Sequence, residues 1–142
     1  MLLVALLLVA AACGGSSYTG LSKPDFVKQA DAICTTDSDK VAGLLASAGH
    51  TPTIDQVKTV YTQSLVPIFR DEVAKLRALK PPKADRARIK AMLDDLEHGV
   101  DELATDIPHV KSNDDLDRLS PAGLQQAADA ASSYGFTVCG KD

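Results

Sequence analysis

The chain of 142 residues is long enough for one domain, and its composition, 45% apolar and 24% charged, is that of a globular protein. It has three Phe, three Tyr and no Trp, so its core must be mainly aliphatic. The net charge of −4 argues against nucleic-acid binding, because proteins that bind nucleic acids are usually basic.

The first residues have the pattern of an export signal. Residues 1–12 are uncharged and apolar and end in three alanines before Cys13. They are too few to span a bilayer, which needs about 20 residues, but they suit the hydrophobic region of a signal peptide. Small residues directly before a cysteine are typical of a lipobox. We therefore expect residues 1–12 to be a lipoprotein signal peptide. No Lys or Arg precedes the apolar run, which indicates a true start codon further upstream.

Cleavage at this site would leave Cys13 as the first residue of the mature protein, carrying acyl chains such as palmitate. Residues 13–21, the lipidated cysteine and a Gly/Ser-rich stretch, are expected to form a short flexible tether. The protein would then be lipid-anchored at the extracytoplasmic face of the cell membrane, with residues 22–142 as its domain.

The first predicted helix begins at Ser22, which forms a capping box with Asp25, and ends at Gly49. The stretch 35–39 is a poor helix former and predicts a bend or a weak point. Cys34 is expected to point inward because it belongs to an apolar face made of Val27, Ala30, Cys34, Val41, Leu45 and Ala48.

A second capping box, Thr53 with Gln56, opens a helix that runs to about Leu79 and ends before two prolines. Pro67 lies inside this helix and predicts a kink, because proline lacks a backbone N–H and clashes one turn back. Such a kink either is filled by side chains or opens an apolar cavity, here lined by Ile54, Tyr61 and Leu65.

The third predicted helix spans 84–107 and has the clearest pattern. Its apolar residues alternate spacings of four and three, which is typical of the seam of a helix bundle. These residues are Ile89, Leu93, Leu96, Val100, Leu103 and Ile107. Residues 108–119 are polar, with a short turn expected around 114–118.

The fourth predicted helix begins at Ser120-Pro121 and ends at Gly135, which is expected to be left-handed, with Phe136 as the apolar contact that follows it. Because two of the three connections are short, neighbouring helices should be antiparallel. The predicted fold is an all-α, up-down four-helix bundle.

The chain has three cysteines. If a lipid occupies Cys13, Cys34 and Cys139 remain, and an exported protein would normally join them. A bridge that closes a loop of about 100 residues stabilises a domain by on the order of 4–5 kcal/mol in the chain-entropy model. The tail after the fourth helix is expected to return along the first helix to bring Cys139 to Cys34.

Three segments carry a family resemblance: DFVKQADAIC at 25–34, LRALKPPKADRARIKAMLDDLEHGVDEL at 76–103 and YGFTVCG at 134–140. They resemble small lipoproteins and secreted proteins of actinobacteria. In those proteins an early Ala-Asp-x-Ile-Cys, a central Leu-x-x-Leu-x-Pro-Pro and a C-terminal Gly-x-x-x-Cys recur. The resemblance implies a helical, disulfide-closed extracellular domain, and it carries over no activity and no site.

No set of residues in the sequence points to catalysis. His98 shares a helix face with Asp94 and Asp101, and imidazole with carboxylates suits zinc or manganese. However, the second Glu-x-x-His element of a di-metal bundle site is missing, as is a Gly-x-Ser-x-Gly nucleophile motif. We therefore interpret these residues as a solvated face and expect no catalytic residue, metal or cofactor. A metal-dependent enzyme is kept as a third alternative.

Charge is distributed unevenly along the chain. Residues 70–90 hold eight basic side chains and three acidic ones, whereas residues 94–117 hold nine acidic side chains and one lysine. The basic group flanks the two prolines and should form one tip of the bundle. Lys80, Lys83 and Arg86 are therefore candidates for contact with anionic lipid or a cell-wall polymer, against the alternative of an ordinary mixed-charge surface.

The function predicted from the sequence is a non-enzymatic binding or interaction module, anchored in the membrane by its lipid. The alternative is a carrier or sensor of a small apolar ligand, such as a lipid, held near Pro67. No protein partner is indicated.

Overall fold

The computed structural model describes residues 18–47 and 52–141, and within these ranges the chain is helical without β-strands. The predicted all-α class is therefore confirmed. The predicted signal peptide, Cys13 and the helix end at Gly49 lie outside the described residues. The α-helices are α1 (Lys23–Ser47), α2 (Ile54–Val60), α3 (Val66–Ala78), α4 (Arg86–Asp106), α5 (Asn113–Asp117) and α6 (Ala122–Tyr134).

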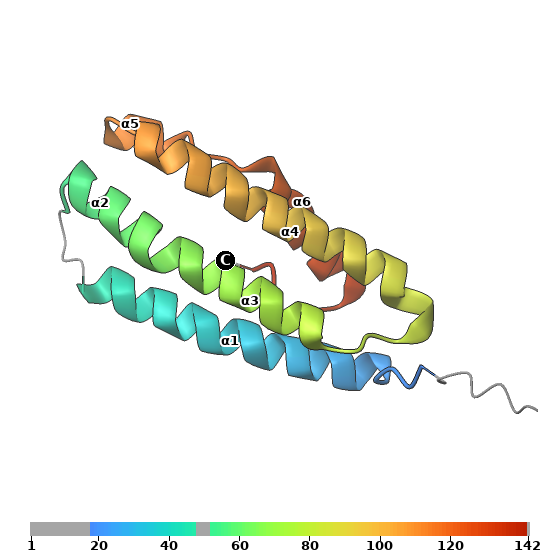
Figure 1. Ribbon diagram of the computed structural model, residues 1–142. Coiled ribbons are helices and arrows are strands. Elements are labelled where there is room, and N and C mark those ends of the chain that lie inside the picture. The colour runs from blue at the N-terminus through green and yellow to red at the C-terminus, as the bar shows by residue number, and fades with distance from the viewer. Residues whose placement is uncertain (1–17, 48–51, 142) are drawn as a thin grey trace, which may run out of the picture.

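The helices pack in chain order: α1 against α3, α3 against α4, and α4 against α6 (Figure 1). The start of α1 and the connection from α3 to α4 lie at one end of the molecule, whereas α2 and α5 lie at the other. Short 3-10 turns flank α4 at Lys83–Asp85 and Ile107–His109.

Local signals in the sequence set most helix ends. The Thr53 side chain accepts a hydrogen bond from the Gln56 amide, and the Gln56 side chain accepts one from the Thr53 amide, as predicted. Gly135 is left-handed with φ of 110°, and the amide of Phe136 donates to the Ala131 carbonyl. This closing pattern satisfies carbonyls that the end of α6 would otherwise leave without partners.

The predicted weak point at 35–39 is wrong, because α1 is continuous through it. The hydroxyls of Thr35 and Thr36 donate back to the carbonyls of residues 31 and 32. Asp37 is only 1% exposed and forms ion pairs with Lys40 and with Lys75 of α3. Long-range pairing thus outweighs the low helix propensity of this stretch.

A π-helical turn, Tyr61–Leu65, joins α2 to α3 directly before Pro67. The amide of Val66 donates to the carbonyl of Tyr61, five residues back. A widened turn relieves the clash that a proline ring makes with the preceding turn of an α-helix. Leu65 is buried, and Ile54 and Tyr61 pack against the core. This favours the first of the two alternatives for the Pro67 site, a kink filled by side chains.

The core has two parts. One lies around the rings of Phe26, Tyr134 and Phe136, whose centroids are 5.2 to 6.2 Å apart, and includes the two cysteines. The other lies towards α5 and consists of Val66, Val100, Leu103, Ile107 and Val110. Five of the six residues of the predicted third-helix seam are buried, and the sixth, Leu96, is half-buried.

The predicted apolar face of the first helix fails at its C-terminal half. Leu45 was expected to point inward, but it is 52% exposed. Within the described residues α1 packs on α3. It meets α6 in its N-terminal half, where Phe26 packs on Tyr134, so the side between α1 and α6 is open only beside the C-terminal half of α1.

Candidate functional site

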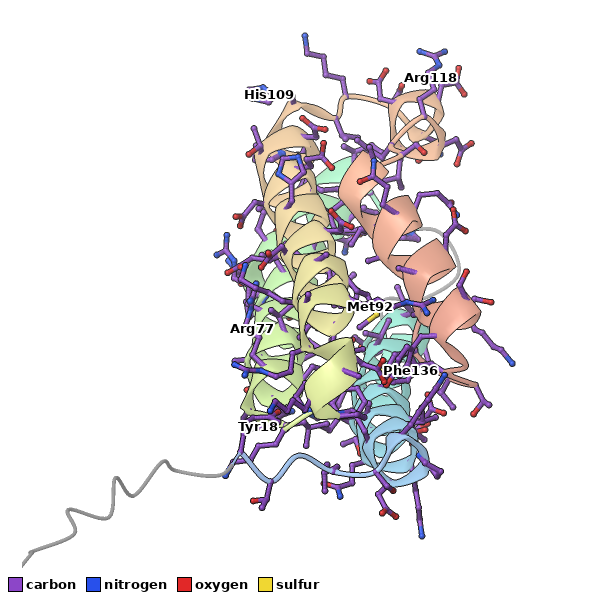
Figure 2. The ribbon with its side chains drawn as sticks, turned by 90° about the vertical axis from the view of Figure 1, so that its right-hand side faces the viewer. Tyr18, Arg77, Met92, His109, Arg118 and Phe136 are labelled. Carbon is purple, nitrogen blue, oxygen red and sulfur yellow. A yellow bond between two sulfur atoms is a disulfide. The ribbon has the colours of Figure 1, made fainter. Side chains whose placement is uncertain are left out.

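The chain that leads into α1 is fixed on the turn between α3 and α4. The Tyr18 hydroxyl donates to the Pro81 carbonyl at 2.7 Å, and the Leu21 amide donates to the Lys80 carbonyl at 2.9 Å. Gly20 allows this contact, since a Cβ there would lie 2.2 Å from the Pro81 oxygen. Figure 2 shows Tyr18 at the opposite end of the molecule from His109 and Arg118.

Four exposed cations surround this turn, and we call them the basic end: Lys80, Lys83, Arg86 and Arg88. The Arg86 guanidinium lies 4.5 Å from the centre of the Tyr18 ring, and that of Arg88 lies 5.3 Å from the Tyr134 ring. None of the four forms an ion pair with a described residue. An open hollow of about 770 Å³ lies beside them, with Lys80, Lys83 and Arg86 in its lining.

The structure therefore brings together the three cations that the sequence singled out. The other cations of the 70–90 segment, apart from Arg88, differ from these three in having carboxylate partners. Arg77 pairs with Asp94 at 2.9 Å and with Glu97 at 2.6 Å, and these carboxylates raise its pKa. Lys75 pairs with Asp71 and Asp37, which raise its pKa in the same way. Within residues 70–90, the cations for which no carboxylate partner is seen are therefore those around the turn.

The possible metal ligands on α4 are not brought together. Asp94 pairs with Lys90 and Arg77, and Asp101 pairs with Arg70. His98 is 70% exposed and lies 3.5 Å from Glu102. In residues 18–47 and 52–141 no group of three His, Cys, Asp or Glu side chains could hold a metal ion.

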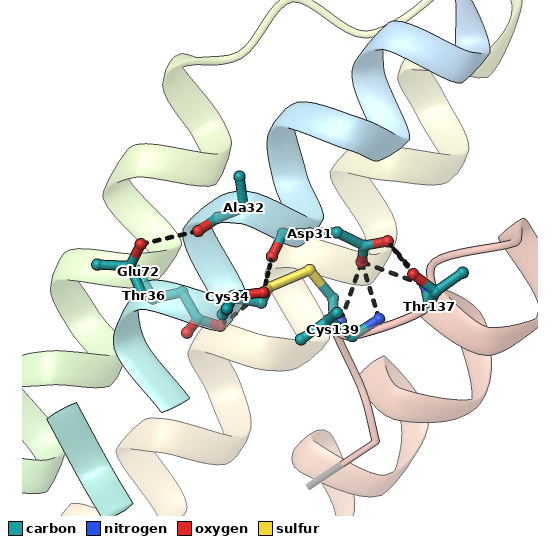
Figure 3. The surroundings of a disulfide bond; sticks show 9 residues. Asp31, Ala32, Cys34, Thr36, Glu72, Thr137 and Cys139 are labelled. Atoms are coloured by element: carbon teal, nitrogen blue, oxygen red, sulfur yellow. Dashed lines mark hydrogen bonds between the residues drawn. A yellow bond between two sulfur atoms is a disulfide. The ribbon is translucent and has the colours of Figure 1, made fainter. Parts of the chain in front are cut away.

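The Sγ atoms of Cys34 and Cys139 lie 2.08 Å apart, at disulfide distance as predicted, and link α1 to the C-terminal tail (Figure 3). Beside them Asp31, which is 8% exposed, accepts hydrogen bonds from the amides of Thr137, Val138 and Cys139 at 2.9 to 3.2 Å. It also accepts one from the Thr137 hydroxyl at 2.6 Å.

Burial alone would raise the pKa of Asp31, but the hydrogen bonds from Thr137, Val138 and Cys139 outweigh it and hold the pKa below its ordinary value. Sequence reasoning did not find this role. Its only signal was the place of Asp31 within the Ala-Asp-x-Ile-Cys segment, three residues before Cys34.

An apolar groove of about 400 Å³ lies where α1 and α6 do not pack. It is lined from α1 by residues such as Val41, Ala42 and Leu45, from α3 by Phe69 and from α4 by Leu96. Three alanines of α6 and Leu124 line the other side. Its lining does not include Ile54, Tyr61 or Leu65, the residues that would line a cavity opened by a kink at Pro67.

Comparison with protein-family models, with curated proteins and with solved structures finds no match for this chain. Among the described helices, none has both the length and the apolar character needed to cross a lipid bilayer.

Proposed function

We propose that this protein is a lipid-anchored lipoprotein at the extracytoplasmic face of the cell membrane, and that its basic end binds the anionic surface of that membrane. The proposal takes residues 1–12 as a removed signal peptide, Cys13 as the lipidated residue, and the four long helical segments as an up-down bundle. In this reading the domain is a binding module and not an enzyme.

The observation that carries the proposal is the contact of Tyr18 with the α3–α4 turn. This contact puts Tyr18 at the same end of the domain as Lys80, Lys83 and Arg86. Four residues lie between Cys13 and Tyr18, so a fully extended chain from Cys13 to Tyr18 spans at most about 18 Å. An anchor at Cys13 would therefore keep the basic end near the lipid headgroups without any need for the bundle to lie flat.

The charge distribution favours the same orientation. Each Lys or Arg near an anionic surface strengthens binding about fivefold, and the effect decays within a Debye length of about 10 Å at 0.1 M salt. The opposite end carries the acidic residues of α5, Asp114, Asp115 and Asp117, which an anionic surface repels. Attraction of the basic end and repulsion of α5 therefore favour the same orientation, with the basic end facing the membrane.

Vesicle sedimentation of the unlipidated mature chain tests this proposal, with phosphatidylglycerol vesicles at low salt and phosphatidylcholine vesicles as reference. The variant combines Lys80→Glu, Lys83→Glu and Arg86→Glu. We expect the wild-type chain to bind the anionic vesicles, and the variant to bind at least about 100-fold more weakly.

The matched control makes the same change in charge at the other end of the molecule, with Lys58→Glu, Lys111→Glu and Arg118→Glu, and should not weaken binding as much. Equal binding by the two triple variants would contradict the proposal, as would absence of wild-type binding at low salt. Binding to an anionic wall polymer without binding to vesicles would contradict the membrane as the partner.

A further inference from the structure

The groove between α1 and α6 is held open by contacts on either side of it. Asp37 ties α1 to Lys75 of α3, while α6 is held on α4 by a close approach of two glycines. A Cβ at Gly99 would lie 2.2 Å from the Leu124 amide nitrogen, and one at Gly123 would lie 2.4 Å from the Gly99 nitrogen. Beside the C-terminal half of α1, each helix is thus fixed to a different neighbour, and the space between them remains.

The C-terminal tail fixes one end of this space. Cys139 is bonded to Cys34 of α1, and Asp31 binds the tail amides next to it. Gly140, which follows, lines the groove. On the α6 side most of the lining side chains are small, namely Ala127, Ala128 and Ala131, with the larger Leu124 beside them. A groove of about 400 Å³ remains between these side chains and those of α1.

The size and lining of this groove match a small-molecule site. Ligand pockets have volumes of roughly 300–1,000 Å³, are mainly apolar, carry a few polar groups that orient the ligand, and often lie between the helices of a bundle. This groove has a volume of about 400 Å³, and its polar side chains are Ser38 of α1 and Glu72 of α3. Glu72 is the single charged residue among the described residues that line it.

The half-buried Glu72 side chain decides the class of ligand. Its Oε1 atom lies 3.7 Å from Cys34 Sγ, which places the carboxylate beside the disulfide. An ionised carboxylate accepts several hydrogen bonds through its two oxygens, so it accommodates a ligand donor in addition to its protein neighbours. An apolar groove with one carboxylate complements a molecule with an apolar chain and one positive charge.

We propose that the groove binds the alkyl chain of a long-chain amine, with the ammonium group donating a hydrogen bond to Glu72. The chain lies between α1 and α6 and covers Leu45, which is otherwise exposed. This site is separate from the basic end and does not depend on membrane binding by Lys80, Lys83 and Arg86.

Isothermal titration of the unlipidated mature chain with octylammonium and decylammonium, each below its micellar concentration, measures this binding. Each additional buried methylene tightens binding about fourfold, so we expect decylammonium to bind with one-to-one stoichiometry and about 15-fold more tightly than octylammonium. Decyl sulfate, which has the same chain with the opposite charge, should bind at least about tenfold more weakly than decylammonium.

Two variants test the location. Ala42 is an exposed residue that lines the groove, so Ala42→Leu fills the groove without disturbing the core and should weaken decylammonium binding at least about tenfold. Ala32→Leu makes the same substitution at an exposed position of α1 outside the groove and should leave binding unchanged. Absence of saturable binding, or equal binding by these two variants, would overturn the proposal.

Glu72→Gln tests the role of the charge. It should abolish the preference for decylammonium over decanol while decanol binding persists, and persistent decanol binding also shows that the variant is folded. A preference that survives in Glu72→Gln, or decyl sulfate binding as tight as that of decylammonium, would overturn the assignment of the carboxylate.

Discussion

Replacing Asp31 with asparagine tests how much the hydrogen bonds between Asp31 and the C-terminal tail contribute to stability. Its carboxylate accepts hydrogen bonds from three consecutive tail amides and from the Thr137 hydroxyl. Hydrogen bonds to a charged group contribute about 1.5–3 kcal/mol each, but such bonds within one network are not additive. Asparagine keeps one acceptor oxygen and turns an NH₂ group towards these donors. We therefore expect Asp31→Asn to lower the free energy of unfolding by about 2–4 kcal/mol.

The loss should depend on pH. The hydrogen bonds hold the pKa of Asp31 in the folded protein below its ordinary value, which is about 3.9 in an unfolded chain. Since the folded state binds the proton less readily, the contribution of Asp31 is fully present above about pH 5 and is lost as the pH falls through the folded pKa. The difference between wild type and Asp31→Asn should accordingly be large at pH 7 and smaller below pH 3.

Urea unfolding followed by circular dichroism, with the disulfide intact in every sample, measures these differences. The exposed Asp39 lies on the same helix, and Asp39→Asn serves as the control, with an expected change within about 0.5 kcal/mol. If Asp31→Asn changed stability at pH 7 no more than this control does, the reasoning about the tail would be refuted. An equal loss at both pH values would refute the assignment to the ionised carboxylate.

Three further predictions concern the bridge, the helix contact and the anchor. Cys34→Ala should lower the free energy of unfolding by about 2–5 kcal/mol in urea titration without reductant, and an unchanged midpoint would contradict the bridge. Gly99→Ala should destabilise the protein by about 1–3 kcal/mol, because the added Cβ would clash with α6. Gly43→Ala, where the added Cβ meets open space, should stabilise it by about 0.5–1 kcal/mol. Thermal unfolding measures both, and a Gly99→Ala variant more stable than Gly43→Ala would contradict the packing of α4 on α6. Cys13→Ser should leave the precursor uncleaved, and an unchanged mature mass would contradict the lipobox.

The helices and their ends were predictable because their causes are local. A threonine with a glutamine three residues later, or a glycine after an apolar run, acts on backbone groups within one turn. The third helix was predictable for a related reason. Six apolar residues recur along it at spacings of four and three, and five of these six are buried. Ser112 with Asp115 is a further capping box, and it gives α5 where only a short turn was expected.

Features that depend on residues far apart in the sequence were not predictable. Asp31 and Thr137 are 106 residues apart. Nothing in the sequence around Asp31 indicates that the backbone amides of the C-terminal tail will bind its side chain. From its helix propensity alone, Asp37 is expected to weaken the helix, and its ion pair with Lys75 of α3 is not visible in the local sequence. The exposure of Leu45 and the groove depend on which neighbour α1 packs against, which the periodicity of one helix does not determine.

The orientation of the anchored protein tests the proposed membrane contact most directly. The lipidated, isotope-labelled protein can be placed in phosphatidylglycerol-containing nanodiscs that carry a nitroxide on a lipid headgroup, and the relaxation of each backbone amide measured by NMR. We expect the strongest enhancement at residues 80–88, which surround the α3–α4 turn, and the weakest in α5, Asn113–Asp117. A uniform profile, or one that is strongest in α5, would contradict a membrane-facing basic end.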